Sequence, residues 1–299
     1  MHRLLTLVIV GAVSLNAAQI AALAFETFTL DNGVTIVVHT KTDTPLVALH
    51  AFVKTGAALE RDYLGCGVSH FVEHVVFGTT TARTEQEVKR LARKLGDTHN
   101  AYTTEDQTCF HMTTMTNRWP LMAEIIADQV ARYTFPSNEV AREQSVITQE
   151  IRMGEEDPDT VLWELLLQTA YIVSPLRVPI AGYLTPFQNV TRADLIRYYR
   201  SVYVANNMIV VLVGPLTRAE ALPVLQRTFG TIPRGRETPR AIPDEPPVLA
   251  PRRAEREHTV NNIYGCIAFP TVSELHPDAP ALEMLARLLG DGELSPLVK

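Results

Sequence analysis

The stretch His70-Phe71-Val72-Glu73-His74 places two imidazoles one helical turn apart, with a carboxylate between them. Residues at positions i and i+4 of a helix share a face, so both rings can reach one ion while Glu73 stays beside it. The segment around it, between Gly67 and Gly78, is mostly apolar, which predicts a short buried helix that carries the motif. We therefore expect a hydrolytic metal site that binds one Zn²⁺ per chain.

A catalytic zinc ion usually has three protein ligands and one open position, so a third ligand is needed. Our candidate is Glu150, which follows Glu143 by seven residues on a helix that the spacing of apolar residues predicts over 139–153. Seven residues make nearly two turns, so one carboxylate can bind the metal while the other forms a hydrogen bond to a ligand. The alternative is that both are solvated surface acids, and spacing alone does not decide between the two interpretations.

The chemistry we infer for this site is peptide hydrolysis by a metal-activated water. Glu73 is the expected general base, which accepts a proton from the water and passes it to the leaving amine. The alternative is a chance pair of histidines, because a five-residue pattern with three fixed positions recurs in long proteins. The apolar helix between glycines favours the functional interpretation.

The composition indicates a globular chain without an electrostatic reason to bind nucleic acid. The 299 residues are 46% hydrophobic and 20% charged, which is enough for one large core or two smaller ones. The net charge is −6, and no basic tract with interleaved aromatic residues is present. Of the three cysteines, Cys66 lies four residues before His70 and could join the metal face, but the neighbouring glycines favour a loop and a small buried thiol.

Residues 1–24 have the features of a signal peptide. A short positive start precedes an apolar run, and Ala22-Leu23-Ala24 is a small-residue cleavage pattern. We expect a bacterial protein that is exported to the periplasm or secreted, with no stable membrane span after cleavage. The alternative is an uncleaved anchor, which the shortness of the apolar run disfavours.

The remaining pattern mixes strands and helices. A tight turn at Asp31-Asn32-Gly33 predicts a hairpin, and Thr84 with Glu87 forms a capping-box pattern. The expected strands are 25–30, 34–39, 47–53, 102–112 and 208–213, and the expected helices, besides the two already named, are 84–95, 121–133, 161–171, 191–199 and 218–228. This predicts an α+β fold, a mixed and mainly antiparallel sheet with helices packed on one face.

A proline-rich and charged stretch divides the chain. We predict a catalytic domain over 25–232, a linker over 233–251 and the beginning of a second, incomplete unit over 252–299. A strand expected at 262–269 and a helix at 279–289 repeat the outline of 47–77 without its histidines. These few elements cannot build a core comparable to the first.

The sequence resembles the pitrilysin and insulinase family of zinc peptidases, the inverzincins, with a bacterial processing-peptidase-like character. The hallmark is the His-x-x-Glu-His order of residues 70–74. Further matching stretches appear in the expected order between residues 25 and about 230: 30–34, 65–79, 100–103, the pair Glu143 and Glu150, 179–182, 203–207 and 213–214.

The resemblance implies that His70, His74 and Glu150 bind zinc, that Glu73 is the base and that Glu143 supports the site. It also implies that Asn100 and Ala101 lie by an edge strand to which a substrate peptide adds as a further strand. Without the resemblance, Asn100 would be interpreted as a simple turn residue.

The family is built from two or more homologous units, whereas the second unit is nearly absent here. We interpret the sequence as a fragment of a longer chain, although a partner chain could supply the missing side of the substrate-binding site. The first hypothesis is therefore an exported zinc endopeptidase or oligopeptidase that acts on extended peptides. The alternative is a partner-dependent or non-catalytic subunit of a two-chain complex, which includes a homodimer or a heterodimer with a second family member.

Overall fold

The structure is a computed structural model that describes residues 25–96, 98–237, 240–290 and 295–296. The predicted signal peptide lies outside these residues. The chain forms two compact units: the first joins residues 24–151 with 178–242, and the second joins 152–177 with the described residues from 243 onward. The predicted division of the chain at the proline-rich stretch 233–251 stays a prediction.

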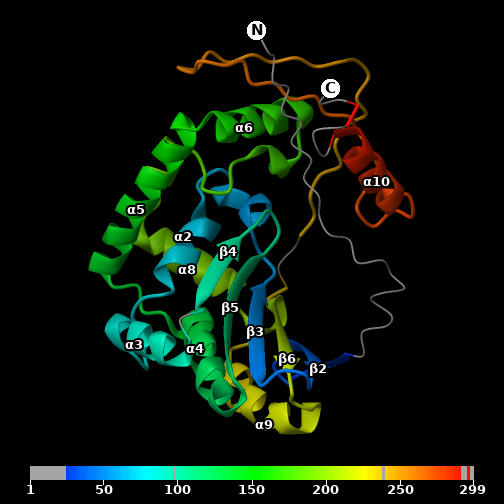
Figure 1. Cartoon of the computed structure of the whole chain (residues 1–299). Helices are drawn as coiled ribbons and strands as arrows, with labels where there is room; N and C mark the ends of the chain where they lie inside the picture. Colours follow the sequence, from blue (N-terminus) through cyan, green and yellow to red (C-terminus); the bar gives the residue numbers. More distant parts are fainter. Residues whose placement is uncertain (1–24, 97, 238–239, 291–294, 297–299) are drawn as a thin grey trace. The chain divides into compact units, whose positions relative to one another are not determined.

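The first unit is built on a six-stranded sheet in the order β1-β2-β6-β3-β5-β4 (Figure 1). Only the β2–β6 pair is parallel, and the other four pairs are antiparallel. The predicted mixed, mainly antiparallel sheet is therefore confirmed. The strands are β1 (Glu26–Thr29), β2 (Thr35–Thr40), β3 (Leu46–Val53), β4 (Asn100–Thr103), β5 (Thr108–Met115) and β6 (Met208–Gly214).

One face of this sheet carries the core, because alternate side chains of each strand point to opposite faces. In β3, Val47, Leu49, Ala51 and Val53 are buried, while the residues between them are half-buried. Large apolar side chains from several helices join the same cluster, among them Phe71, Ile125, Leu195 and Leu225. The helices are layered on one face of the sheet, as the pattern predicted.

Helix boundaries follow local capping signals closely. Thr84, Thr191 and Thr217 each accept a hydrogen bond from the backbone of the third helical residue, and an acidic residue at that position completes a capping box. The helices are α2 (Val68–Val75), α3 (Glu85–Leu95), α4 (Trp119–Arg132), α5 (Ser137–Glu156), α6 (Pro158–Ala170), α7 (Leu184–Gln188), α8 (Arg192–Val202), α9 (Arg218–Thr228) and α10 (Ala279–Gly290).

Two predicted strands differ from the structure. The segment 102–112 was expected as one strand, but it is part of a hairpin in which β4 and β5 flank a turn at 104–107. Thr104 fixes that turn, since its hydroxyl bonds Asp106 Oδ1 at 3.2 Å and the Gln107 carbonyl at 3.3 Å. The strand expected at 262–269 is wrong: this segment is irregular, with no strand partner among the residues that the structure describes.

The second unit contains α6, the end of α5 and α10 (Figure 1). Its helix at Ala279–Gly290 agrees with the expected helix at 279–289. Across the described part of the chain, no helix combines the length and the apolar character that a membrane crossing requires.

Candidate metal centre

Helix α2 carries the histidine motif and begins directly after Gly67, which adopts φ = 62°. Any other residue would be strained there, and a Cβ on Gly67 would approach the Ala181 carbonyl oxygen to 2.1 Å. Tyr183 N–H donates to the Gly65 carbonyl at 2.9 Å, so the segment 181–183 is held against the start of α2. The glycines around the motif therefore permit a close backbone contact that fixes where this helix starts.

A buried carboxyl group accepts a hydrogen bond from the first turn of α2. Glu60 is 2% exposed, and its Oε1 accepts the backbone N–H of Ser69 at 2.7 Å. The Ser69 hydroxyl lies 2.6 Å from the Tyr198 hydroxyl, which in turn lies 2.8 Å from Thr55 Oγ1. Burial raises the pKa of Glu60 to about 8, although its hydrogen bonds to Ser69 and Gly67 oppose the shift.

We expect Glu60→Gln to stabilise the fold increasingly as the pH rises. In the unfolded chain this carboxyl ionises near pH 4.3, whereas in the folded chain it ionises near pH 8, so the wild type loses stability between about pH 4 and pH 8. A glutamine keeps an oxygen for the Ser69 N–H and does not ionise. Urea unfolding with chelator present, at pH 5 and at pH 8.5, checks this: the advantage of the variant should be a few kcal/mol larger at the higher pH. An advantage that does not change with pH would contradict it.

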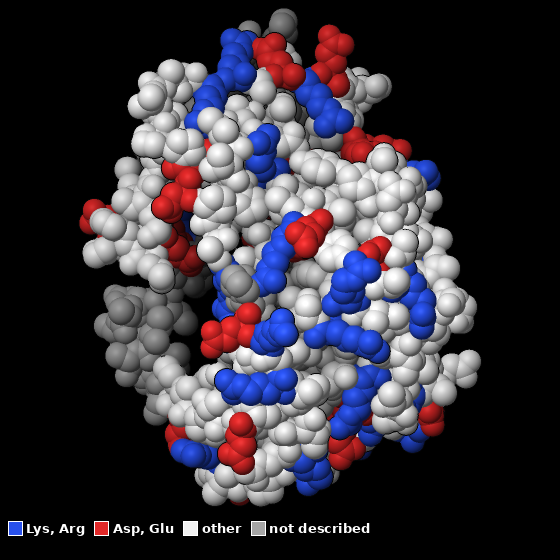
Figure 2. All heavy atoms as spheres, turned by 180° about the vertical axis from the view of Figure 1, so that it is seen from behind, with Lys and Arg blue, Asp and Glu red and all other residues white. Residues whose placement is uncertain are grey.

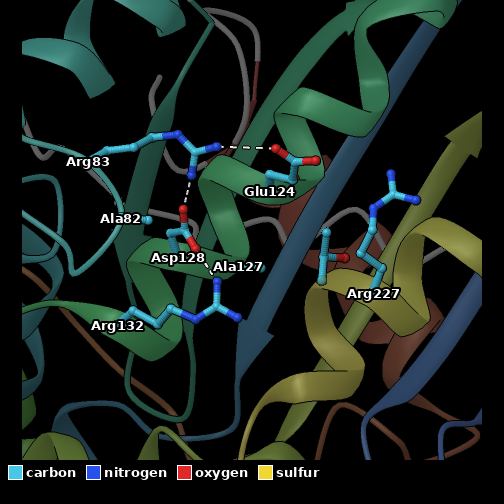
Figure 3. Close-up of a pocket in the computed structure, with 8 residues that line it drawn as sticks. Ala82, Arg83, Glu124, Ala127, Asp128, Arg132 and Arg227 are labelled. Carbon is cyan, nitrogen blue, oxygen red and sulfur yellow. Dashed lines mark hydrogen bonds and ion pairs between the residues drawn. The ribbon is translucent and has the colours of Figure 1, made fainter.

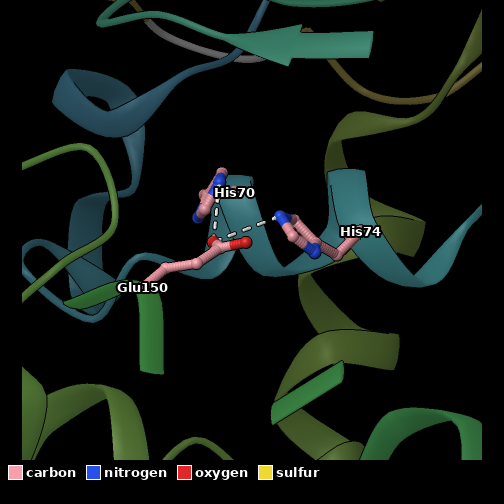
Figure 4. A group of neighbouring side chains, drawn as sticks. All are labelled: His70, His74 and Glu150. Carbon is pink, nitrogen blue, oxygen red and sulfur yellow. Dashed lines mark ion pairs between the residues drawn. The ribbon is translucent and has the colours of Figure 1, made fainter. Parts of the chain in front are cut away.

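The structure brings His70, His74 and Glu150 together, although Glu150 lies far away in the sequence (Figure 4). Glu150 Oε2 is 3.9 Å from His70 Nε2 and 3.6 Å from His74 Nε2. One ligand atom from each residue lies within 4.8 Å of the others. Two ligands of a tetrahedral zinc ion, each at about 2.1 Å, are about 3.4 Å apart, so these separations are close to those of a zinc site.

Glu143 orients the second histidine. Its Oε2 lies 3.4 Å from His74 Nδ1, and Arg142 Nε donates to its Oε1 at 3.1 Å. A carboxylate on Nδ1 leaves Nε2 facing Glu150, which is the arrangement found behind many metal-binding histidines. The hydrogen bond with His74 lowers the pKa of Glu143, which keeps this carboxylate ionised.

The pKa values of the two imidazoles are shifted in opposite directions. Burial, followed by the charge of His74, lowers the pKa of His70 to about 4, so this ring is neutral at neutral pH and has the form that binds metal. Burial would also lower the pKa of His74, but the hydrogen bond to Glu143 and the charges of Glu150, Glu73 and Glu143 reverse the effect and raise it. A bound cation would compete with a proton for this ring.

Glu73 lies on the same helix and is 9% exposed. Thr103 Oγ1, at the end of β4, donates to Glu73 Oε2 at 2.6 Å. Burial raises the pKa of Glu73, and the hydrogen bond from Thr103 opposes this shift. A base whose pKa is raised toward neutrality suits proton transfer near pH 7.

Asn100 and Ala101 lie in β4, whose only partner among the described strands is β5. This strand is therefore the outer edge of the sheet, on the side that holds Glu73 through Thr103. The outer backbone groups of such a strand can pair with an added chain.

Cys66 is not part of this cluster. It precedes α2 in a loop, as the glycines around it suggested, and it is half-buried rather than buried. Cys109 and Cys266 are free thiols too.

A separate cavity of about 260 Å³ lies between α4 and α9 (Figure 3). Its charged groups largely neutralise one another: Arg83 pairs with Asp128 and, at 3.1 Å, with Glu124, and Arg132 also pairs with Asp128. No residue of the metal cluster lines it, so we do not assign the active site to this cavity.

In the view of Figure 2 many Lys and Arg side chains are exposed, with Asp and Glu side chains among them.

The contacts of Glu60 with Ser69 and of Thr103 with Glu73 were not predicted from the sequence. Glu60 and Thr103 both lie close in space to α2, but neither has a helical spacing to the histidines that would have indicated contact. For Thr103, the available signal was its place in the stretch 100–103, which resembles a family motif.

The donor set fits a zinc ion, since two imidazole nitrogens and a carboxylate oxygen converge and the His74 ring is oriented by a carboxylate. His70 Nδ1 is buried without a hydrogen-bond partner in the described part of the chain, and the other nitrogen of this ring, Nε2, faces Glu150.

The chain belongs to the insulinase family, peptidase family M16. The sequence model of that family matches residues 35–183, and the model of the peptidase M16 inactive domain matches residues 189–299. The chain thus belongs to a family of peptidases, as the histidine motif indicated.

Named relatives include proteases. The chain is 25% identical to the uncharacterized zinc protease YmxG of Bacillus subtilis, over 88% of this chain and 63% of that protein. It is 27% identical to the mitochondrial-processing peptidase subunit beta of Saccharomyces cerevisiae, over 89% of this chain and 60% of that protein. The chain therefore spans less than two thirds of the length of these relatives.

Among solved structures, the periplasmic protease PqqL from Escherichia coli is similar, with a TM-score of 0.68 and 25% identity. The similarity covers 74% of this chain and 25% of that one.

Proposed function

We propose that this chain is a zinc-dependent endopeptidase or oligopeptidase that cleaves extended peptides. The observation that carries the proposal is the convergence of His70, His74 and Glu150 beside the carboxylate of Glu73. The relatives named zinc proteases support zinc as the ion. When bound, zinc would supply Lewis-acid activation of water and of the substrate carbonyl.

In this proposal each residue of the site has a separate role. Glu73 accepts the proton of the attacking water and delivers it to the leaving amine. Thr103 holds the Oε2 atom of Glu73 by a hydrogen bond, which leaves the other carboxylate oxygen to accept the proton. Glu143 keeps His74 oriented. Asn100 and Ala101 bind the substrate along the free edge of β4, where backbone hydrogen bonds would hold an extended peptide in place.

A direct test is cleavage of unstructured peptides by the purified chain. Activity should disappear with a chelator and return with added Zn²⁺. A chain that has been freed of metal and still cleaves at the same rate would contradict the proposal.

We expect Thr103→Val to lower kcat about tenfold, as loss of a supporting hydrogen bond often does, while zinc binding is unchanged. Since the hydroxyl of Thr103 lowers the pKa of Glu73, its removal should raise that pKa and move the acid limb of the pH–rate profile to higher pH. Thr103→Ser keeps the hydroxyl and is the matched control. Equal pH profiles for the valine variant and the wild type would show that the contact has no role in proton transfer.

The second candidate is a partner-dependent or non-catalytic subunit. It is favoured by the similarity to relatives named as the beta subunit of a processing peptidase. We propose further that residues 252–299 begin a second homologous unit behind a linker at 233–251. Zinc binding without turnover, followed by turnover when a second family member is added, would favour this candidate.

We also propose that the protein is exported. The signal-peptide pattern of residues 1–24 supports it, as does the similarity to a protein described as a periplasmic protease. Cell fractionation of a tagged full chain should find a product shortened near Phe25 outside the cytoplasm.

A further inference from the structure

A third glutamate lies on the same face of α5 as the two that meet the histidines. Glu139 precedes Glu143 by four residues and Glu150 by eleven, so all three project from one side of the helix. Glu139 is 5% exposed, and no cation within ion-pair distance of it is found among the described residues. Burying a carboxylate without a cation is costly, and its hydrogen bonds must offset that cost.

The hydrogen bonds of Glu139 go to the segment that follows α2. Its Oε2 accepts the Thr79 backbone N–H at 2.9 Å, and its Oε1 accepts the Thr79 hydroxyl at 2.6 Å. The Tyr133 hydroxyl also donates to Oε2, at 3.1 Å. A Cβ on Gly78 would come within 2.0 Å of Oε2, so this close approach depends on glycine at position 78.

The hydrogen bonds between Glu139 and Thr79 join the two elements that supply the metal cluster. Thr79 comes four residues after Val75, the last residue of α2, while Glu139 lies in the first turns of α5. Along α5, Glu143 is about one turn from Glu139 and Glu150 is about 16 Å from it. The Thr79 carbonyl accepts the backbone N–H of Thr134 at 3.0 Å, which fixes the segment on its other side.

We propose that Glu139 is a positioning residue: by binding Thr79 it sets how α5 docks beside α2, and so brings Glu143 and Glu150 to the histidines. Glu139 touches neither the cluster nor the substrate edge. This inference rests on the proposed zinc site.

The test measures the zinc affinity of the full chain by competition with a chelator of known affinity, at a temperature well below unfolding. In Glu139→Gln an amide replaces one of the accepting oxygens, and we expect zinc affinity to fall about tenfold or more, in the range found for residues that support metal ligands. Thr79→Val should lower it as well, whereas Thr79→Ser keeps the hydroxyl and should bind zinc like the wild type. If Glu139→Gln does not fold, the comparison of zinc affinity between Thr79→Val and Thr79→Ser tests the inference instead.

A control separates positioning from general stability. Leu225→Val alters a fully buried side chain of α9 and should lower the unfolding temperature without changing zinc affinity. Wild-type affinity in Glu139→Gln, or a loss in Leu225→Val as large as in Glu139→Gln, would overturn the inference while the zinc site stands. A wild-type chain that binds no zinc would instead overturn the proposed function, and this inference with it.

Discussion

Glu73→Gln is expected to lower peptide cleavage by about 10²- to 10⁴-fold, the contribution typical of a positioned general base. The amide has nearly the shape of the carboxylate but cannot accept a proton from water at neutral pH. Because Glu73 is not one of the three clustered residues, zinc affinity should remain close to that of the wild type. Initial rates on an unstructured peptide, together with zinc content, check both parts of the prediction.

The matched control for this variant is Glu156→Gln, an exposed glutamate at the end of α5. It should keep full activity. If Glu73→Gln retained most of its activity, another group would have to be the base; if it lost zinc and activity together, its carboxylate would belong to the metal site.

His74→Ala should have the second large effect, because this ring connects the whole cluster. Its Nε2 faces Glu150 at 3.6 Å and its Nδ1 faces Glu143 at 3.4 Å. The variant loses a ligand and its orienting carboxylate loses its partner, so we expect zinc affinity to fall by more than about 100-fold, beyond the loss that a supporting residue alone causes. Cleavage should then be undetectable at low free zinc.

The stability of the metal-free protein is the control for His74→Ala. His74 is half-buried at one edge of the core, so the unfolding temperature measured with chelator should change little, while the stabilisation that zinc gives the wild type should disappear. Zinc-dependent stabilisation equal to that of the wild type would place the metal elsewhere.

Local signals predicted most of the fold. The helix Arg218–Thr228 was predicted with the bounds that the structure has, since Thr217 and Glu220 form a capping box whose partners are three residues apart. The β4–β5 hairpin was missed because its turn at 104–107 contains neither glycine nor proline and is stabilised by Thr104 instead. The irregular segment 262–269 has strand-like composition, but a strand also needs a neighbour with which to pair.

The site was predictable only where sequence spacing determines contact. His70, Glu73 and His74 share one helix, so their proximity follows from its geometry. Glu150 meets them through tertiary packing, which spacing alone could not reveal and which the family resemblance suggested. The hydrogen bonds of Thr103 and Glu139 join residues 30 and 60 positions apart, and no local pattern encodes such pairs.

The central claim is that this chain holds one zinc ion between two residues of α2 and one of α5. The most direct measurement is anomalous X-ray scattering at the zinc edge from crystals grown with zinc. The account predicts one strong peak about 2.0–2.2 Å from His70 Nε2, His74 Nε2 and a Glu150 carboxylate oxygen. An empty position there in zinc-saturated crystals, or a peak bound by other residues alone, would contradict it.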